Sequence, residues 1–182
     1  MAPARWQRAW PKCRSSVVII REERREDISL IRDVNRLAFE QDQEANIVDA
    51  LRSNGAALLS LVAVLDDAVV GHILYSPARI GSVEGAGLAP MAVLPGHQRR
   101  GIGSQLVEAG NARLRADGCP FIIVLGHTAF YPRFGFTPAR PMGIHCEWDV
   151  PDDVFMIAVL DEDRMRGISG LATYRQEFST VS

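Results

Sequence analysis

Apolar residues recur along this chain with two different periods, and the change between them separates predicted helices from predicted strands. The short β-branched run at 17–20 predicts a first strand. Apolar positions then follow at intervals of three or four residues across 28–38 and again around 47–51, which predicts two helices. Asp27 stands where it can cap the first helix, and the second is expected to stop near 54–55.

From residue 59 the period shortens to that of strands. The runs 59–65 and 69–75 flank Asp66-Asp67-Ala68, which predicts a hairpin. Residues 81–87 are rich in glycine, and we expect them to form a turn. The following run, 88–94, is predicted as the next strand.

The second half of the chain begins with an amphipathic helix, whose stripe is formed by Ile102, Leu106, Gly110 and Leu114 and which should end near 117–118. The apolar run 121–125 is typical of a strand buried on both faces. A helical turn and three weaker strands are expected after it, at 129–134, 143–147, 154–160 and 170–174. This order suggests one α/β sheet with helices on both faces.

Composition narrows the class of protein. The 182 residues suit one domain, and 47% hydrophobic with 23% charged residues is typical of a soluble globular chain. A formal net charge of −2 gives no reason to expect nucleic acid or an anionic membrane as a partner. The longest apolar run, 56–65, is too short to span a bilayer.

The ends of the chain and its cysteines suggest a compartment. Residues 1–16 have no apolar core of a secretory signal; we expect a flexible arm there, with an organelle transit segment as the alternative. Residues 17–175 are predicted as a single domain and 176–182 as a C-terminal tail. Three scattered cysteines without a Cys-x-x-Cys pair favour a reducing cytoplasm.

The clearest chemical signal lies at 88–104, where a strand, a loop and a helix follow one another. A helix N-terminus has unpaired N–H groups and the positive end of a dipole, so it attracts phosphate oxygens. Glycines let the backbone approach an anion, and arginines add charge. We therefore interpret the loop as a diphosphate cradle that contains Gln98, Arg99, Arg100, Gly101 and Gly103.

Two nucleotide-binding motifs can be excluded at this loop. A P-loop that begins at Gly96 would need Lys and Ser or Thr where Ile102 and Gly103 stand. A dinucleotide fingerprint that begins at Gly101 would need a third glycine in place of Leu106. Each motif lacks a residue on which its chemistry depends.

The remaining pattern, Val-Leu-Pro-Gly-His-Gln-Arg-Arg-Gly-Ile-Gly at 93–103, resembles the acetyl-CoA-binding motif of the GCN5-related N-acetyltransferases (GNAT). Downstream, Phe-Tyr-x-x-x-Gly-Phe at 130–136 resembles a second segment of that family. The longer pattern Leu-Gly-x-x-x-Phe-Tyr-x-Arg-Phe-Gly-Phe at 125–136 resembles its YhbS-like subgroup. The resemblance covers 17–175. It implies a GNAT-like α/β fold: a mixed, mostly antiparallel central sheet with helices on both faces and a splayed parallel strand pair.

The resemblance also implies roles for residues. Acetyl-CoA would be the cosubstrate, and no metal is expected. A backbone bulge in the first strand of the splayed pair would polarise the thioester carbonyl. Tyr131 matches the family tyrosine near the sulfur and is the candidate general acid, the alternative being a core aromatic residue. The expected cofactor-binding residues are Met91, Ala92, Val93, Gln98, Arg99, Arg100, Gly101, Ile102, Gly103 and Ser104.

The sequence does not identify a general base. Glu40, Glu44, His72 and Glu84 are candidates for acceptor contact, and His127 departs from the acidic residue expected after Leu-Gly in the subgroup. The triplet His-Cys-Glu at 145–147 has the residue types of a metal site, but alternation along a strand would place its side chains on two faces.

These observations predict an N-acetyltransferase that moves an acetyl group from acetyl-CoA to a primary amine of a small molecule or protein, by direct attack in a ternary complex. No cysteine lies in the cofactor motifs, which disfavours an acyl-cysteine route. Two alternatives stay open: a catalytically weak acyl-CoA-binding sensor or regulator, and a subunit that acts through association. A homodimer is compatible with the resemblance, and the loops at 39–46 and 76–87 are expected to determine the acceptor.

Overall fold

The computed structural model describes residues 17–181, so the predicted arm at 1–16 lies outside the described part of the chain. The elements in chain order are β1 (Ile19–Glu22), η1 (Arg25–Asp27), α1 (Ile28–Phe39), α2 (Gln43–Ser53), β2 (Leu59–Leu65), β3 (Ala68–Ile80), β4 (Val83–Val93), η2 (Pro95–His97), α3 (Ile102–Ala116), β5 (Phe121–Leu125), η3 (Tyr131–Phe134), β6 (Thr137–Pro138), η4 (Arg140–Met142), β7 (Ile144–Cys146), β8 (Phe155–Val159), α4 (Glu162–Met165), β9 (Gly170–Thr173) and η5 (Gln176–Val181).

One mixed sheet organises the described chain, in the order β1-β2-β3-β4-β5-β8-β6. Neighbours in this order run antiparallel except β4 and β5, which are parallel. The short strands β7 and β9 are also parallel to each other, and β9 pairs with the end of β3. The predicted fold, mostly antiparallel with a parallel pair, is confirmed.

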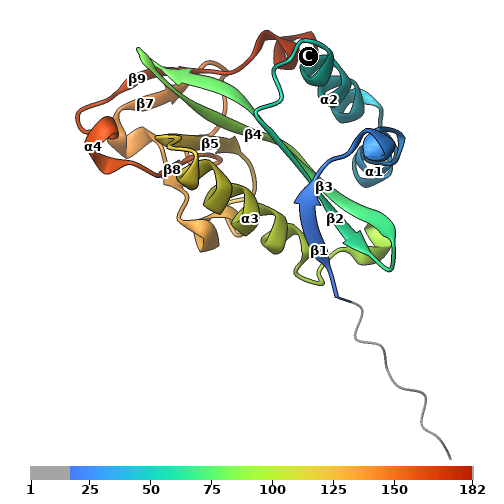
Figure 1. Ribbon diagram of the computed structural model, residues 1–182. Helices are drawn as coiled ribbons and strands as arrows, with labels where there is room; N and C mark the ends of the chain where they lie inside the picture. Colours follow the sequence, from blue (N-terminus) through green and yellow to red (C-terminus); the bar gives the residue numbers. More distant parts are fainter. Residues whose placement is uncertain (1–16, 182) are drawn as a thin grey trace, which may run out of the picture.

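Helices cover both faces of the sheet, as predicted (Figure 1). Alternation along β2 shows why: Leu61 and Ala63 belong to the core under α3, whereas Val62 belongs to the core under α1 and α2. A third apolar cluster lies between β5, β7, β8 and β9. The sheet is therefore buried on both sides around β2 to β5, the strands that carry the site.

Continuous apolar runs predicted strand boundaries accurately, whereas the high glycine content of one segment led to a wrong prediction of a turn. The strands predicted at 59–65 and 121–125 are β2 and β5 without a shift. The turn predicted at 81–87 is wrong, because β4 already begins at Val83. Gly85 and Gly87 lie within that strand because the rings of Phe121 and Tyr174 occupy their side-chain space; an added Cβ would come within 2.7 and 2.8 Å of them.

Asp27 has a different role from the predicted one. It is the N-cap residue of α1 by position, but its side chain makes no capping hydrogen bond to that helix. The carboxylate instead accepts hydrogen bonds from the Arg24 backbone N–H, at 2.7 Å, and from the Arg21 guanidinium. It therefore stabilises the bend between β1 and α1.

The segment expected as a C-terminal tail forms η5 and lies beside α2 (Figure 1). Glu177 anchors it: the carboxylate is buried and accepts a hydrogen bond from Asn54 Nδ2 at 2.8 Å and two from Arg175. The last part of the chain is thus fixed next to the helix that precedes β2.

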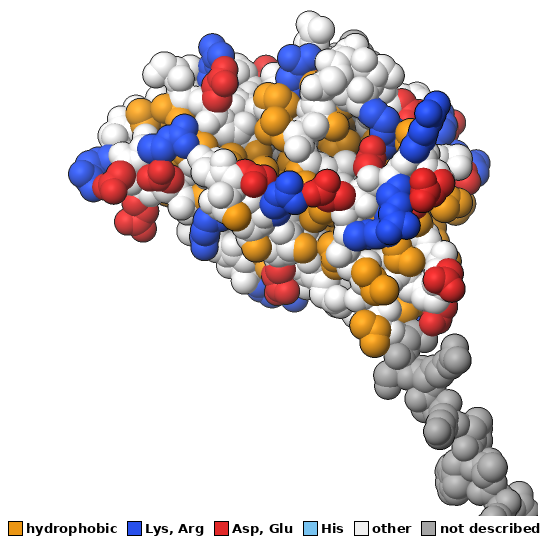
Figure 2. All heavy atoms as spheres, viewed as in Figure 1, with side chains coloured by type: hydrophobic (Ala, Val, Ile, Leu, Met, Phe, Trp, Pro, Cys, Tyr) orange, Lys and Arg blue, Asp and Glu red, His pale blue; other side chains and the backbone are white. Residues whose placement is uncertain are grey.

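The face of the molecule shown in Figure 2 has no single dominant charge. In the face shown in Figure 2, basic and acidic side chains are interspersed. Among residues 17–181, no helix combines the length and the apolar character needed to cross a bilayer.

Candidate active site

The site begins where β4 and β5 separate. Their parallel pairing covers three positions, from Ala86 with Ile122 to Leu88 with Val124. Beyond them β5 ends at Leu125, while β4 continues to Val93. The two strands therefore diverge as the predicted splayed pair, which leaves room for a ligand between them.

A bulge lies in β4 at this point. Tyr75 of β3 pairs with Leu88 and Ile73 pairs with Met91, so Leu74 stands opposite two residues, Ala89 and Pro90. Bulges are among the few places in a sheet that accept proline. Since Pro90 has no N–H, any donor to a carbonyl here must come from a neighbouring residue.

A cavity of about 530 Å³ lies at the end of β4 and the start of α3. Most of the predicted cofactor-binding residues form its wall: Met91, Val93, Gln98, Arg99, Gly101, Ile102, Gly103 and Ser104. The two others are elsewhere. The Ala92 side chain is buried in the core under α1 and α2, and Arg100 is exposed outside this wall.

The backbone of this loop has the geometry of an anion cradle. Gly101 has a φ of +80° directly before the first turn of α3, in the left-handed region that glycine adopts without a Cβ penalty. Gln98 Nε2 donates to the Val93 carbonyl at 3.0 Å, which ties the loop to β4. An added Cβ at either Gly96 or Gly101 would meet nothing within 4 Å, so the approach to the helix N-terminus is unobstructed. These residues fit a diphosphate.

Four residues of this wall were not predicted as ligands: His97, His127, Phe130 and Arg133. The Arg133 guanidinium lies over the Phe130 ring, 4.8 Å from its centre, and Nε donates to the Phe130 carbonyl at 3.2 Å. His97 Nδ1 is buried with no hydrogen-bond partner among the described residues. The signal for Arg133 was its place inside the second motif.

A second cavity, also of about 530 Å³, continues from the first and shares Met91, His127 and Phe130 with it. Its wall includes both sides of the strand divergence, Leu88 to Met91 and Leu125 to His127, together with Tyr131. The two motifs of the sequence, far apart along the chain, therefore border two adjoining cavities, together called the groove.

Tyr131 is placed by aromatic packing. Its ring meets those of Phe130 and Phe136 edge-on, with centroids 5.1 and 5.5 Å apart, and the residue is 6% exposed. Gly126 provides the space, because a Cβ there would lie 2.2 Å from Tyr131 Cε2. Burial raises the pKa of Tyr131 to about 12, so the hydroxyl carries its proton at neutral pH.

The candidates for acceptor contact differ in whether they line a cavity. Glu44 lines the second cavity, together with Phe39 and Ile47. Glu84 is an exposed residue in an ion pair with Arg79, and neither it nor Glu40 lines either cavity. Phe39, Ile47 and Phe178 of the wall had no signal in the sequence, because each reads as one more core or surface position.

The proposal of His72 as an acceptor contact is wrong. The side chain is fully buried between the sheet and α1, where its ring nitrogens hydrogen-bond to Ser60 Oγ at 3.0 Å and Asn35 Nδ2 at 3.1 Å. Burial lowers the pKa of His72 to about 3. It is a neutral core histidine.

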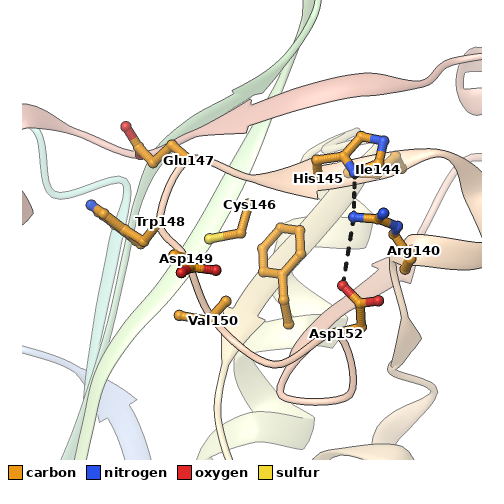
Figure 3. Close-up of a pocket in the computed structure, with 10 residues that line it drawn as sticks. Arg140, Ile144, His145, Cys146, Glu147, Trp148, Asp149, Val150 and Asp152 are labelled. Carbon is orange, nitrogen blue, oxygen red and sulfur yellow. Dashed lines mark hydrogen bonds and ion pairs between the residues drawn. The ribbon is translucent and has the colours of Figure 1, made fainter.

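A separate cavity of about 300 Å³ lies beside β7 and shares no residue with the groove (Figure 3). Cys146 points into it, whereas His145 and Glu147 leave the strand on the other side, as alternation predicts. Arg140 bridges His145, at 2.9 Å, and Asp152, at 3.6 Å. No group of metal ligands is present among residues 17–181.

Comparison with known proteins agrees with this geometry. Residues 57–138 match the family model of the acetyltransferase (GNAT) domain. The chain is 34% identical to YhbS of Escherichia coli K12, an uncharacterized N-acetyltransferase, over 79% of this chain and 88% of that protein. It is 38% identical to YjhQ of the same organism, likewise an uncharacterized N-acetyltransferase, over 70% of this chain and 74% of that protein.

Solved structures show the same architecture. The crystal structure of E. coli YhbS in complex with CoA superimposes with a TM-score of 0.87 at 33% identity, covering 91% of this chain and 93% of the other. A GNAT family acetyltransferase from Brucella melitensis in complex with acetyl-CoA gives a TM-score of 0.75 at 35% identity, covering 90% and 99%.

Proposed function

Because the chain belongs to the GNAT family of N-acetyltransferases, we propose that it transfers the acetyl group of acetyl-CoA to a primary amine by direct attack in a ternary complex. The observation that carries the proposal is the groove, whose two adjoining cavities place the loop before α3 and Tyr131 on either side of Met91, His127 and Phe130. Membership of the family makes the enzyme an acyltransferase; its acceptor and its mechanism are proposed.

The loop before α3 would hold the diphosphate. The N–H groups of the first turn of α3 would donate hydrogen bonds to phosphate oxygens, and Arg99 and Arg133 on the cavity wall would add positive charge. The similarity to proteins that bind CoA and acetyl-CoA supports this assignment. The diverging strands β4 and β5 would then receive the pantetheine arm.

Acetyl-CoA supplies the acetyl group as a thioester. Attack by the neutral amine forms a C–N bond and breaks the C–S bond, so one proton must leave the nitrogen and one must reach the sulfur. Tyr131, protonated and on the groove wall, donates to the departing thiolate. His127, the ionisable side chain that lines both cavities, can take the amine proton.

The test is release of free thiol from acetyl-CoA in the presence of primary amines: amino acids, polyamines, alkylamines and lysine peptides. Amine-dependent thiol release, with the N-acetyl product seen by mass spectrometry, is the expected result. Tight CoA binding without turnover on any amine would instead favour an acyl-CoA sensor. Absence of CoA binding would contradict the enzyme and sensor functions and leave the role in association.

A further inference from the structure

The part of the groove beyond Tyr131 has a wall assembled from three distant segments. Phe39 ends α1, Ile47 belongs to α2, and Phe178 is presented by η5. Met91, Phe130 and Leu125 continue the same apolar surface toward the strand divergence. An acceptor that reaches the reacting carbon must therefore lie against apolar side chains.

Glu44 is the only acidic side chain on this wall among the described residues. Gln41 Nε2 donates to both of its carboxylate oxygens, at 3.0 and 3.1 Å, which fixes the group at the start of α2. No Arg or His in residues 17–181 forms an ion pair with it, whereas the next carboxylate of α2, Asp49, pairs with Arg32 and Arg52. One negative charge is thus available to a ligand.

Charge also differs between the two ends of the groove. Arg99 and Arg133 stand at the phosphate end, and the acceptor end has Glu44 without an Arg or Lys on its wall. Such complementarity selects a cation at the acceptor end and disfavours an anion. A second ammonium group on the same ligand would face the apolar wall of Phe39, Ile47 and Phe178, which offers no carboxylate to pair with it.

Building on the proposed function, we propose that the acceptor is a monoamine with an apolar body, an alkylamine or arylalkylamine, whose body packs against Phe39, Ile47 and Phe178. Its single nitrogen docks at Glu44 as an ammonium group and becomes the attacking neutral amine when it releases one proton to solvent. Amines that bear a carboxylate or a second ammonium group are excluded by the same surface.

Matched substrate pairs test the class directly. Hexylamine and 1,6-diaminohexane share a chain length and differ by one ammonium group; 2-phenylethylamine and phenylalanine differ by one carboxylate. We expect kcat/KM to favour the first member of each pair by about 10-fold or more, the range in which one mismatched polar group changes specificity. Equal values within both pairs would overturn the proposed class.

Variants locate the ammonium site. Glu44→Gln should raise KM for hexylamine about 10-fold, since a charge-assisted bond is replaced by a neutral one, and leave KM for acetyl-CoA within about 2-fold. Glu40→Gln, a carboxylate off the wall near the same helix junction, is the matched control and should leave both values unchanged. Phe178→Ala should reduce the preference for hexylamine over shorter alkylamines. A merely structural role of Glu44 in α2 would not change one KM alone.

The outcomes separate this proposal from the one on which it rests. Acetylation of all amines alike, or equal effects of Glu44→Gln and Glu40→Gln, would overturn the acceptor class and leave acetyl transfer intact. If no amine is acetylated, the proposed function fails. Calorimetric titration of hexylamine into the CoA-loaded protein then tests whether the pocket at Glu44 binds a monoamine. Binding that Glu44→Gln weakens about 10-fold would support it, and no binding would overturn it.

Discussion

Tyr131 is the residue on which the proposed chemistry depends most. Two aromatic rings meet its edges, and Gly126 leaves the space that its own ring occupies. Burial keeps its hydroxyl protonated over the whole physiological range, as a general acid requires. Position and protonation state therefore have a common origin in the packing around the ring.

Removing the hydroxyl alone tests this role. In Tyr131→Phe the ring packing stays and the proton donor is lost, so we expect kcat to fall about 100-fold or more, within the usual contribution of general acid–base catalysis. The affinity for acetyl-CoA, measured by calorimetry, should change less than about 3-fold, because binding and proton donation are separate contributions. Wild-type turnover in the variant would remove Tyr131 from the mechanism.

Filling the space at Gly126 tests the packing. Gly126→Ala brings a Cβ to 2.2 Å from Tyr131 Cε2, so the ring must move out of position. We expect a loss of kcat similar to that of Tyr131→Phe and a free energy of unfolding lower by about 1–3 kcal/mol, the usual cost of overpacking. Urea unfolding and the thiol-release assay measure the two effects.

Gly96→Ala is the control for that substitution, since a Cβ at Gly96 meets nothing within 4 Å and its φ is not positive. Its unfolding midpoint should match the wild type. An unaltered kcat in Gly126→Ala would mean that the position of the Tyr131 ring is not important for turnover.

At the scale of elements, a buried network of hydrogen-bonded side chains connects the bend after β1, strands β2 and β3, and helix α1. Ser60 Oγ donates to the Glu23 carboxylate, and His72 Nε2 lies 3.0 Å from Ser60 Oγ. Asn35 Nδ2 donates to His72 Nδ1 at 3.1 Å, which assigns the proton of the neutral ring to Nε2. This network gives hydrogen-bond partners to polar groups that would otherwise be costly to bury.

The buried His72 of this network makes the free energy of unfolding depend on pH. His72 has a pKa of about 3 when folded and an ordinary value of 6.5, so between these values the unfolded state binds the extra proton. Stability should therefore be full above pH 6.5 and fall progressively toward pH 3. We expect a lower urea midpoint at pH 4.5 than at pH 7.5, measured by fluorescence.

His72→Gln should weaken that dependence and lower stability at pH 7.5, because Ser60 and Asn35 lose their partner. His145→Asn, a substitution at an exposed histidine, should leave the pH dependence as in the wild type. Equal midpoints of the wild-type protein at the two pH values would contradict a neutral buried His72.

Element boundaries were predictable where burial is uniform. An apolar run such as 121–125 must be a strand between two covered faces, and it is β5. Prediction failed at Gly85 and Gly87, because the rings that fill their space come from Phe121 and Tyr174, distant in sequence. The short elements β6, η4 and α4 had no periodic signal, since each spans fewer than five residues.

At the scale of the whole molecule, the groove joins a basic end to an apolar end that carries one carboxylate. Binding at such a groove should stabilise the folded state by mass action. CoA at 100 times its Kd adds about 2.7 kcal/mol, which for a chain of this size raises Tm by about 5–10 °C. Differential scanning fluorimetry measures the shift.

Arg133→Ala should reduce the Tm shift given by a fixed CoA concentration, because the cavity loses a phosphate partner. Arg140→Ala, at the separate cavity beside β7, is the matched control and should preserve the shift. A Tm unaffected by CoA at any concentration would contradict the assignment of the loop before α3.

The sequence alone determined the family and the sheet with helices on both faces, and it predicted the phosphate-binding loop and the role of Tyr131. These depend on local features: apolar periodicity, and motifs whose chemistry needs fixed spacing. It also left Glu44 and His72 as equal candidates. Only the tertiary structure decided between them, because burial and partners are set by packing: His72 lies within the core under α1, and Glu44 lies on the groove wall.

The wall of the proposed acceptor site can be seen in the tertiary structure alone. Phe39, Ile47 and Phe178 lie far apart along the chain and become one wall when η5 packs beside α2. No local pattern marks such residues, since an aromatic side chain has the same signature in a core and in a pocket. The cofactor-binding residues were therefore predicted from contiguous sequence, whereas the proposed acceptor wall is visible only in the fold.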